Sequence, residues 1–242
     1  MKNIIITGAS NGIGKELAKK LRKKYNIINI DIAKGKMTKV DFYKCDLSNK
    51  KDLLKTINKI KTKYNSIYAL VNNAAKSTFK ALDEQMLEEW ENTLSVNITA
   101  PYILSKEFAI LLKESSGHII NISSTRAIMS ESGTESYSAS KGAISSLTHA
   151  LAMSLSPEVK VNSISPGWIN TDKKYIATKE DNLQHPSGRV GVPSDVVDIV
   201  KFLLKNRGFI TASDFVVDGG MSKKMIYVWS KKAQAKGLML FW

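Results

Sequence analysis

A glycine-rich turn near the amino terminus constrains the fold of this chain more than any other feature. Residues 7–14 read TGASNGIG; they follow an apolar run at 3–7 and precede a helical pattern through Leu17, Ala18 and Leu21. In a strand-turn-helix unit, glycines let backbone N–H groups approach a pyrophosphate at the positive end of the helix. We therefore expect a nucleotide-binding turn that comprises Gly8, Ser10, Asn11, Gly12, Ile13 and Gly14.

The apolar runs along the rest of the chain predict the fold class. They lie at residues 26–31, 40–44, 67–72, 118–123, 159–165 and 215–217, with helix-like segments between most of them. Strands rich in Ile and Val that alternate with helices indicate a parallel sheet covered on both faces. We expect a doubly wound, Rossmann-like α/β fold with three αβα layers.

The length of 242 residues and the 43% hydrophobic content suit a single domain, which we place at residues 1–227. Residues 228–242 form a C-terminal extension that combines three lysines with an apolar end. This extension can dock on a neighbouring subunit, cover a pocket or be an artificial addition, and the sequence does not choose among these.

Two segments are expected to depart from regular structure. The helical pattern over 87–113 contains Pro101, which must kink or break the helix, so we expect an irregularity near Asn97. Residues 171–187 are polar and follow the carboxyl end of a strand, where α/β folds bind ligands. They are a candidate substrate lid.

Composition limits the classes of partner. No signal-peptide pattern and no apolar run long enough for a bilayer is found, so we expect a soluble, cytoplasmic protein without a membrane partner. The lone Cys45 cannot form an internal disulfide, and His118, His149 and His185 lack metal-ligand spacing, so no metal site is expected. The net charge of +14 comes from scattered lysines with few aromatic residues among them, which predicts no specific nucleic-acid partner.

The spacing of the glycines resembles the TGxxxGxG pattern of the short-chain dehydrogenase/reductase family. Two further segments are similar to that family: Cys45-Asp46-Leu47, and Asn72-Asn73-Ala74-Ala75, in which Ala75 replaces the usual glycine. The resemblance implies that Asp46 and Leu47 contact the adenine and that Asn73 and Ala74 belong to the cofactor site. Taken alone, Asp46 could equally cap the following helix.

Asp31 favours NAD over NADP. It ends the second apolar run about 20 residues beyond the glycines, where a carboxylate accepts hydrogen bonds from the adenosine ribose and repels a 2′-phosphate. Family members that prefer NADP often carry Arg or Lys where this chain has Asn11. Lys34 and Lys36 lie nearby and can soften the preference.

Tyr137 and Lys141 form the candidate acid-base pair. Their separation of four residues in a helical segment places both side chains on one helix face. A free phenol has a pKa of about 10, and a neighbouring ammonium favours the phenolate. Tyr137 could then exchange a proton with an alcohol or ketone oxygen, and Lys141 could also hold the nicotinamide ribose.

The family resemblance adds further site residues. Ser124 lies 13 residues before Tyr137 and matches the serine that hydrogen-bonds the substrate oxygen, with Ser123 as the runner-up. Asn97 matches the position that binds a water linking the lysine to solvent. The segment 166–171 resembles the loop after the sixth strand, and it adds to the cofactor site Pro166, Gly167, Ile169 and Thr171.

These residues predict an NAD-dependent enzyme that interconverts a secondary alcohol and a ketone. The alternatives are an NADPH-dependent 3-oxoacyl-carrier-protein reductase and a non-catalytic regulatory protein that binds a dinucleotide. The resemblance also implies a homotetramer or homodimer. Six side chains are expected around the small-molecule substrate: Arg126, Met129, Glu135, Trp168, Tyr175 and His185, the last as an exposed loop histidine.

Overall fold

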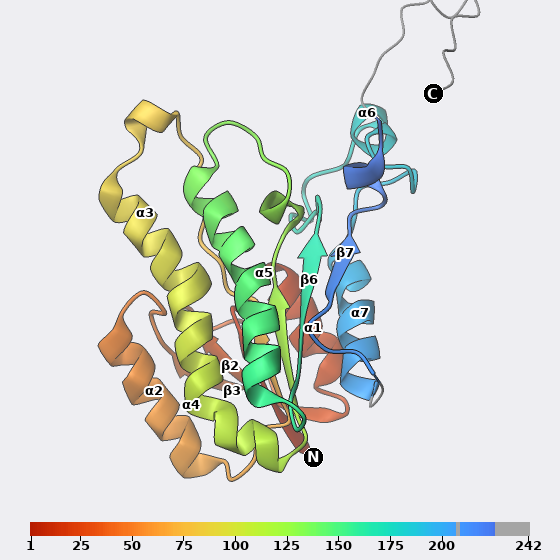
Figure 1. Cartoon of the computed structure of the whole chain (residues 1–242). Coiled ribbons are helices and arrows are strands. Elements are labelled where there is room, and N and C mark those ends of the chain that lie inside the picture. The colour runs from red at the N-terminus through yellow and green to blue at the C-terminus, as the bar shows by residue number, and fades with distance from the viewer. Residues whose placement is uncertain (207–208, 226–242) are drawn as a thin grey trace, which may run out of the picture.

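The computed structural model describes residues 1–206 and 209–225, which form a seven-stranded parallel sheet between two layers of helices (Figure 1). The strands are β1 (Lys2–Thr7), β2 (Tyr25–Asp31), β3 (Asp41–Lys44), β4 (Ala69–Asn72), β5 (His118–Ile122), β6 (Lys160–Pro166) and β7 (Asp214–Val217). Their order in the sheet is β3-β2-β1-β4-β5-β6-β7. The chain therefore reverses direction across the sheet between β1 and β4, the position at which doubly wound folds bind ligands.

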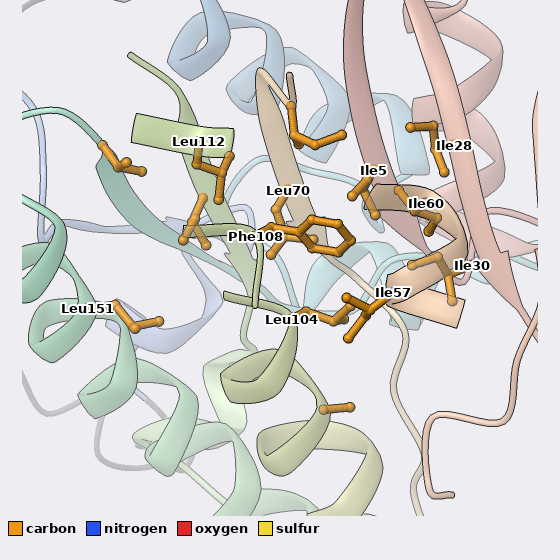
Figure 2. Close-up of a cluster of buried hydrophobic side chains, with 14 of the residues drawn as sticks. Ile5, Ile28, Ile30, Ile57, Ile60, Leu70, Leu104, Phe108, Leu112 and Leu151 are labelled. Atoms are coloured by element: carbon orange, nitrogen blue, oxygen red, sulfur yellow. The ribbon is translucent and has the colours of Figure 1, made fainter. Parts of the chain in front are cut away.

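Two hydrophobic clusters hold the helices to opposite faces of the sheet. The main helices are α1 (Gly12–Leu21), α2 (Lys50–Lys63), α3 (Leu87–Leu94), α4 (Ala100–Glu114), α5 (Glu135–Leu155) and α7 (Pro193–Lys205). Side chains from α2, α4 and α5 pack on one face with Ile5, whereas α1 and α7 pack on the other with Ile4 and Ile6. This alternation along β1 is the period of two that strands impose. Figure 2 shows Phe108 of α4 among Ile57, Leu70 and Leu104 in the first cluster.

The expected fold class is confirmed, and each predicted strand lies within two residues of an observed one. None of the described helices is long and apolar enough to cross a membrane. The predicted extension at residues 228–242, and its boundary at residue 227, lie outside the described residues.

The irregularity expected near Asn97 is a π-helical turn, Ser95–Thr99, which joins α3 to α4. Pro101 does not break the helix: it occupies the first turn of α4, where its missing N–H is tolerated. The wider turn is the irregular element, and such turns occur often at functional sites.

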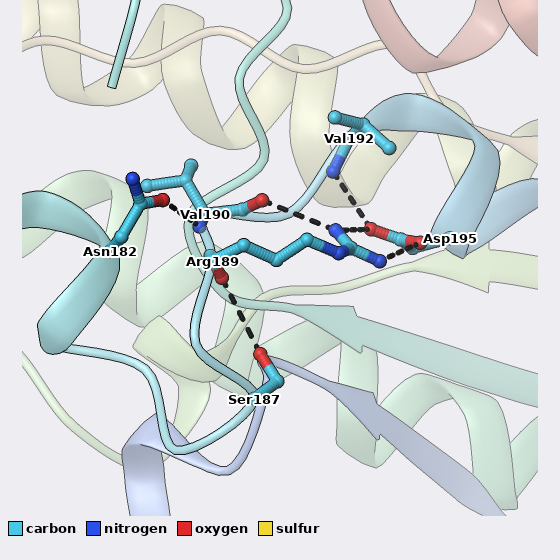
Figure 3. A network of polar contacts seen from close by, with 6 residues as sticks. All are labelled: Asn182, Ser187, Arg189, Val190, Val192 and Asp195. Carbon is cyan, nitrogen blue, oxygen red and sulfur yellow. Dashed lines mark hydrogen bonds and ion pairs between the residues drawn. The ribbon is translucent and has the colours of Figure 1, made fainter. Parts of the chain in front are cut away.

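The candidate lid is a loop that contains one short helix, α6 (Lys179–Leu183), and that is anchored at its far end (Figure 3). Arg189 makes two parallel hydrogen bonds to the carboxylate of Asp195, at 2.7 and 2.8 Å. One oxygen of Asp195 also accepts from the N–H of Val192 at 2.8 Å, which caps α7. These contacts hold the pKa of Asp195 below its usual range, with the Arg189 hydrogen bond as the largest cause.

His118 on β5 is a buried histidine, as its apolar surroundings in the sequence suggest, whereas His149 is exposed on α5. The ring of His118 packs edge-on against Tyr68 at 5.3 Å. Burial, with the charges of Lys2 and Lys160, lowers its pKa to about 4. The folded protein therefore keeps His118 neutral at a pH at which an unfolded chain would protonate it.

We predict that His118 makes the fold sensitive to acid. Because its pKa is lower in the folded state, stability is fully present above about pH 6.5 and falls as pH drops toward 4, by up to about 3 kcal/mol. The change His118→Phe should flatten the slope of the free energy of unfolding over this range, measured by urea denaturation at several pH values. The control His149→Phe should keep the slope; an equal slope in the wild type and His118→Phe would contradict the prediction.

Candidate active site

A long cavity of about 830 Å³ lies at the carboxyl edge of β1, β2 and β4. Many of the residues predicted to bind cofactor line it together: Gly8, Asn11, Gly12, Ile13, Asp31, Asp46, Leu47, Asn73, Ala74, Tyr137 and Thr171. The size and position of this cavity suit an extended ligand that runs from β2, across the turn after β1, toward α5.

The turn after β1 can be built only with glycine at its critical positions. Gly8 adopts φ +70°, and a Cβ on Gly14 would lie 2.3 Å from the carbonyl oxygen of Gly8. Helix α1 therefore begins in direct contact with the turn, and its first residues, Gly12 and Ile13, line the long cavity. Gly14 itself does not line the cavity; it permits the close approach. A cradle of backbone donors at a helix start fits a pyrophosphate.

The carboxylate of Asp31 lies at the β2 end of the long cavity. Its oxygens accept hydrogen bonds from Ser10 N at 3.0 Å and Ala33 N at 3.2 Å. Ser10, which is buried, also donates its hydroxyl to Ala33 O, so it acts as a link within the turn rather than as a lining residue. The negative charge is thus held at the edge where the adenosine ribose of a dinucleotide would lie.

Asp46 does not cap the following helix. That position is taken by Asn49, whose side chain accepts from Lys51 N and Asp52 N. Asp46 accepts instead from the N–H and hydroxyl of Ser48, which lower the pKa of its carboxyl group. The carboxylate lines the long cavity beside Leu47.

An inner cavity of about 200 Å³ continues the long one toward β5 and β6. Five further predicted residues line it, Ser124, Lys141, Pro166, Gly167 and Ile169, together with Ile13, Asn73 and Tyr137. The ammonium of Lys141 donates to Ile122 O at 2.8 Å and lies 5.4 Å from the centre of the Tyr137 ring. The predicted pair therefore shares one face of α5, as its spacing requires.

Burial sets the proton affinities of this pair. It lowers the pKa of Lys141 to about 8, since the ammonium is removed from water. Burial raises the pKa of Tyr137, opposed by a hydrogen bond with Ser124 and by the positive charge of Arg126. The sequence suggests Lys141 as the charge that favours the phenolate, whereas in the structure the charge that lowers the pKa of Tyr137 is that of Arg126.

Ser124 and Ser123 occupy different environments. Ser124 lines the inner cavity, hydrogen-bonds Tyr137 and accepts from Arg126 N at 3.2 Å. Ser123 lines the same cavity, but its hydroxyl donates to Lys141 O at 3.1 Å. The choice of Ser124 over Ser123 stays a prediction, supported by the hydrogen bond between Ser124 and Tyr137.

Asn97 lies in the π-helical turn, buried beside α5. Its side-chain amide donates to Lys76 O at 2.8 Å and to Ser140 Oγ at 2.9 Å, and its oxygen accepts from Lys76 N at 2.8 Å. Asn97 lines neither the long nor the inner cavity. It reaches the helix position next to Lys141 and joins that helix to the loop after β4.

An outer cavity of about 440 Å³ opens on the other side of Tyr137. Three of the six expected substrate residues line it: Arg126, Met129 and Trp168. Glu135 does not; it accepts from Gln85 at the start of α5. Tyr175 packs on Trp168 at 5.9 Å and hydrogen-bonds Asp181, outside this cavity.

The expectation that His185 is an exposed loop histidine is wrong. Its side chain is 3% exposed, with the ring 6.1 Å from Trp168 and Nδ1 3.0 Å from Asp181 O. It lies behind the outer cavity because α6 folds the lid segment back onto the strand ends, a long-range contact that local composition does not reveal.

The sequence analysis missed other residues of the outer cavity: Ser77, Phe79, Thr125, Ser130, Glu131, Gln184 and Met221. Phe79 is 64% exposed, and its ring lies 6.2 Å from that of Tyr137. The sequence signal that could have identified Phe79 is its position, four residues after the Asn72-Asn73-Ala74-Ala75 segment. Met221 follows the last strand, and nothing in its surroundings in the sequence marked it.

Within the described residues, no group of histidine, cysteine and acidic side chains could hold a metal ion. Cys45 is a buried free thiol, and burial raises its pKa to about 11. The groups that line the inner and outer cavities beside Tyr137 include the ammonium of Lys141, the guanidinium of Arg126 and the hydroxyl of Ser124.

Comparison with known proteins agrees with this architecture. Residues 8–222 match a family model described as enoyl-(acyl carrier protein) reductase. An uncharacterized oxidoreductase of Thermotoga maritima is 42% identical over 250 residues, covering 93% of this chain and 98% of the relative. A 3-oxoacyl-[acyl-carrier-protein] reductase of Chlamydia pneumoniae is 31% identical, covering 91% and 97%.

Solved structures show the same fold over nearly the whole chain. An apo SCOR enzyme from Clostridium thermocellum is 39% identical with a TM-score of 0.88, covering 95% of this chain and 96% of that one. A 4-hydroxyisoleucine dehydrogenase complexed with NADH is 30% identical with a TM-score of 0.86, covering 93% and 100%.

We predict that Gly14→Ala weakens both the fold and dinucleotide binding. The added methyl group would lie 2.3 Å from Gly8 O, and overpacking of this kind costs about 1–3 kcal/mol. NADH affinity should fall at least about tenfold because the turn must move. Gly142→Ala on α5 is the matched control, since its methyl group meets only Ala127 O, at 3.9 Å. Urea denaturation and NADH fluorescence titration measure both effects; an unchanged Gly14→Ala protein would refute the close approach.

Proposed function

The chain belongs to the short-chain dehydrogenase/reductase family, and from this premise we propose that it is an NAD-dependent oxidoreductase that interconverts a secondary alcohol and a ketone. One observation carries the proposal: among the described residues, Tyr137 alone lines the long, inner and outer cavities. A phenol at the junction of a dinucleotide-sized cavity and a separate small pocket is placed to exchange a proton with a substrate oxygen.

The cofactor supplies the hydride acceptor or donor. This chain's own residues fit NAD in three places: the backbone cradle of Gly8 and Gly14, the carboxylate of Asp31, and the ammonium of Lys141. Lys141 would hold ribose hydroxyls with the ammonium hydrogens that do not bond Ile122 O. The dinucleotide would lie along the long cavity with its reactive end in the inner cavity.

Proton transfer would then run through Tyr137. In reduction, the phenol gives its proton to the substrate oxygen; in oxidation, the phenolate takes the alcohol proton. Ser124 would donate a hydrogen bond to the same oxygen, since its hydroxyl lines both the inner and the outer cavity. Asn97, through Lys76 and Ser140, would position the helix and the water path that serve Lys141.

The alternative with specific support is a 3-oxoacyl-carrier-protein reductase that uses NADPH. The description of the family model and the Chlamydia pneumoniae relative favour it. The charge of Asp31 at the ribose end of the long cavity weighs against it, because a 2′-phosphate there would be repelled. A non-catalytic role would leave the junction position of Tyr137 unexplained. A homotetramer or homodimer in the cytoplasm stays a prediction.

We predict that Asp31 selects the cofactor. The wild-type protein should bind NADH at least about tenfold tighter than NADPH, and Asp31→Asn should narrow that ratio by removing the repelling charge. Fluorescence titration of each protein with NADH and with NADPH measures this ratio of affinities. Asp198→Asn, which removes an exposed carboxylate on α7, is the control that should keep the ratio. Tighter NADPH binding by the wild type would favour the acyl reductase.

We predict that Tyr137→Phe abolishes turnover but not cofactor binding. Loss of the proton donor should lower kcat by about 10²–10⁴-fold, while NADH affinity stays within a few-fold. A screen of hydroxy acids, polyols, steroids and simple secondary alcohols with either cofactor supplies the assay. Tyr102→Phe, on the exposed face of α4, is the control. Cofactor binding without turnover of any compound by the wild type would support a regulatory protein instead.

A further inference from the structure

Arg126 is a largely buried cation whose hydrogen bonding is incomplete. Its side chain is 22% exposed and lines the outer cavity. Nη2 pairs with Glu131 Oε2 at 2.7 Å, but Nη1 is buried and has no hydrogen-bond partner among the described residues. A buried donor without a partner costs about 1–3 kcal/mol, more when it is charged, and calls for an explanation.

The backbone of Arg126 lies beside the candidate catalytic residues. It lies in the turn Thr125–Ala127 that follows β5, and its N–H donates to Ser124 Oγ at 3.2 Å. Its charge is near enough to act on the pKa of Tyr137. A ligand group that binds Nη1 would share the outer cavity with an oxygen held by Ser124 and Tyr137, since all three residues line it.

The charges around the outer cavity suit a singly charged anion. Among the described residues, Arg126 and Glu131 are the only charged side chains that line it, and the side chain of Glu131 is 75% exposed. The pair with Glu131 is thus a solvent-side contact of the kind that contributes about 0–1 kcal/mol. A phosphate would bring about two negative charges to one guanidinium that already pairs with Glu131, whereas a carboxylate brings one.

Resting on the proposed function, we propose that the substrate is a small hydroxy acid or oxo acid whose carboxylate binds Nη1 of Arg126. The cavity of about 440 Å³ accommodates a compact molecule with its carboxylate a few carbon atoms from the reacting carbon. Trp168 and Met129 cover the carbon chain. A thioester carbonyl in this place would offer Nη1 only a neutral acceptor, which pairs less well with a guanidinium than a carboxylate does.

The kinetic test compares acids with their neutral amides. The wild-type protein is assayed with 3-hydroxybutanoate and 3-hydroxybutanamide in oxidation, and with 4-oxopentanoate and 4-oxopentanamide in reduction. The acid should be preferred in kcat/KM by about tenfold or more, and Arg126→Met should bring the ratio close to one. An effect of the substitution on Tyr137 would change kcat/KM for the acid and for its amide alike, so it cancels in the ratio of the two values. Arg22→Met removes a partly exposed arginine that bonds Thr38 O, away from the outer cavity, and it should keep the preference.

A binding test does not depend on turnover. Calorimetric titration in the presence of NADH should show tighter binding of butanoate than of butanamide. In Arg126→Met, the affinity for butanoate should fall at least about tenfold. Glu131→Gln should keep or strengthen butanoate binding, because it frees the guanidinium. Equal binding of the two probes, or equal losses in Glu131→Gln and Arg126→Met, would overturn the inference.

The two proposals fail in different ways. Turnover of amides as fast as acids would keep the oxidoreductase and overturn the role of Arg126. Butanoate binding through Arg126, with no turnover of any alcohol or ketone, would keep the anion site and overturn the oxidoreductase.

Discussion

The site depends on hydrogen bonds that join the carboxyl ends of β1 and β4. Parallel neighbours have no hairpin to set their register, so side chains at the strand ends supply the connection. The hydroxyl of Thr7 accepts from Asn73 N and Ala74 N, both at 3.0 Å, and the amide of Asn73 donates back to Thr7 O at 2.9 Å. The glycine turn and the loop after β4 are thereby held against each other, and the long cavity lies above them.

A second set of buried amides joins the strands β4 and β5 to α5 by hydrogen bonds. Asn72 donates to Asn121 at 2.8 Å, and Asn121 donates to Thr148 of α5 at 2.9 Å. Asn97 adds a contact with Ser140 from the π-helical turn. Because these groups are buried, each lost hydrogen bond would leave a desolvated partner, which makes the arrangement stiff. The long helix is thus positioned by polar contacts near its middle and first half, where Tyr137 and Lys141 lie.

The sequence predicted what depends on local spacing. The glycines of the turn, the end of β2 at Asp31 and the helix face shared by Tyr137 and Lys141 follow from strand and helix periods. It failed where packing between distant segments decides. His185 is buried because α6 returns to the strand ends, and Arg126 gains its importance from the orientation of one nitrogen. Neither property leaves a repeating hydrophobic pattern in the sequence. The irregularity near Asn97 was detectable because Pro101 interrupts a long helical pattern.

Electrostatics connects the inner and outer cavities through one phenol. Burial raises the pKa of Tyr137, which keeps it protonated, and burial also desolvates the two cations near it, Lys141 and Arg126. Negative charge that develops on an oxygen beside Tyr137 would lie between these cations, in a region where water screens little. Such a field stabilises that charge without rearrangement of the protein, because strand ends and turns already hold both cations in place. The cost of burying two incompletely bonded cations is therefore consistent with a site built to receive anionic oxygen.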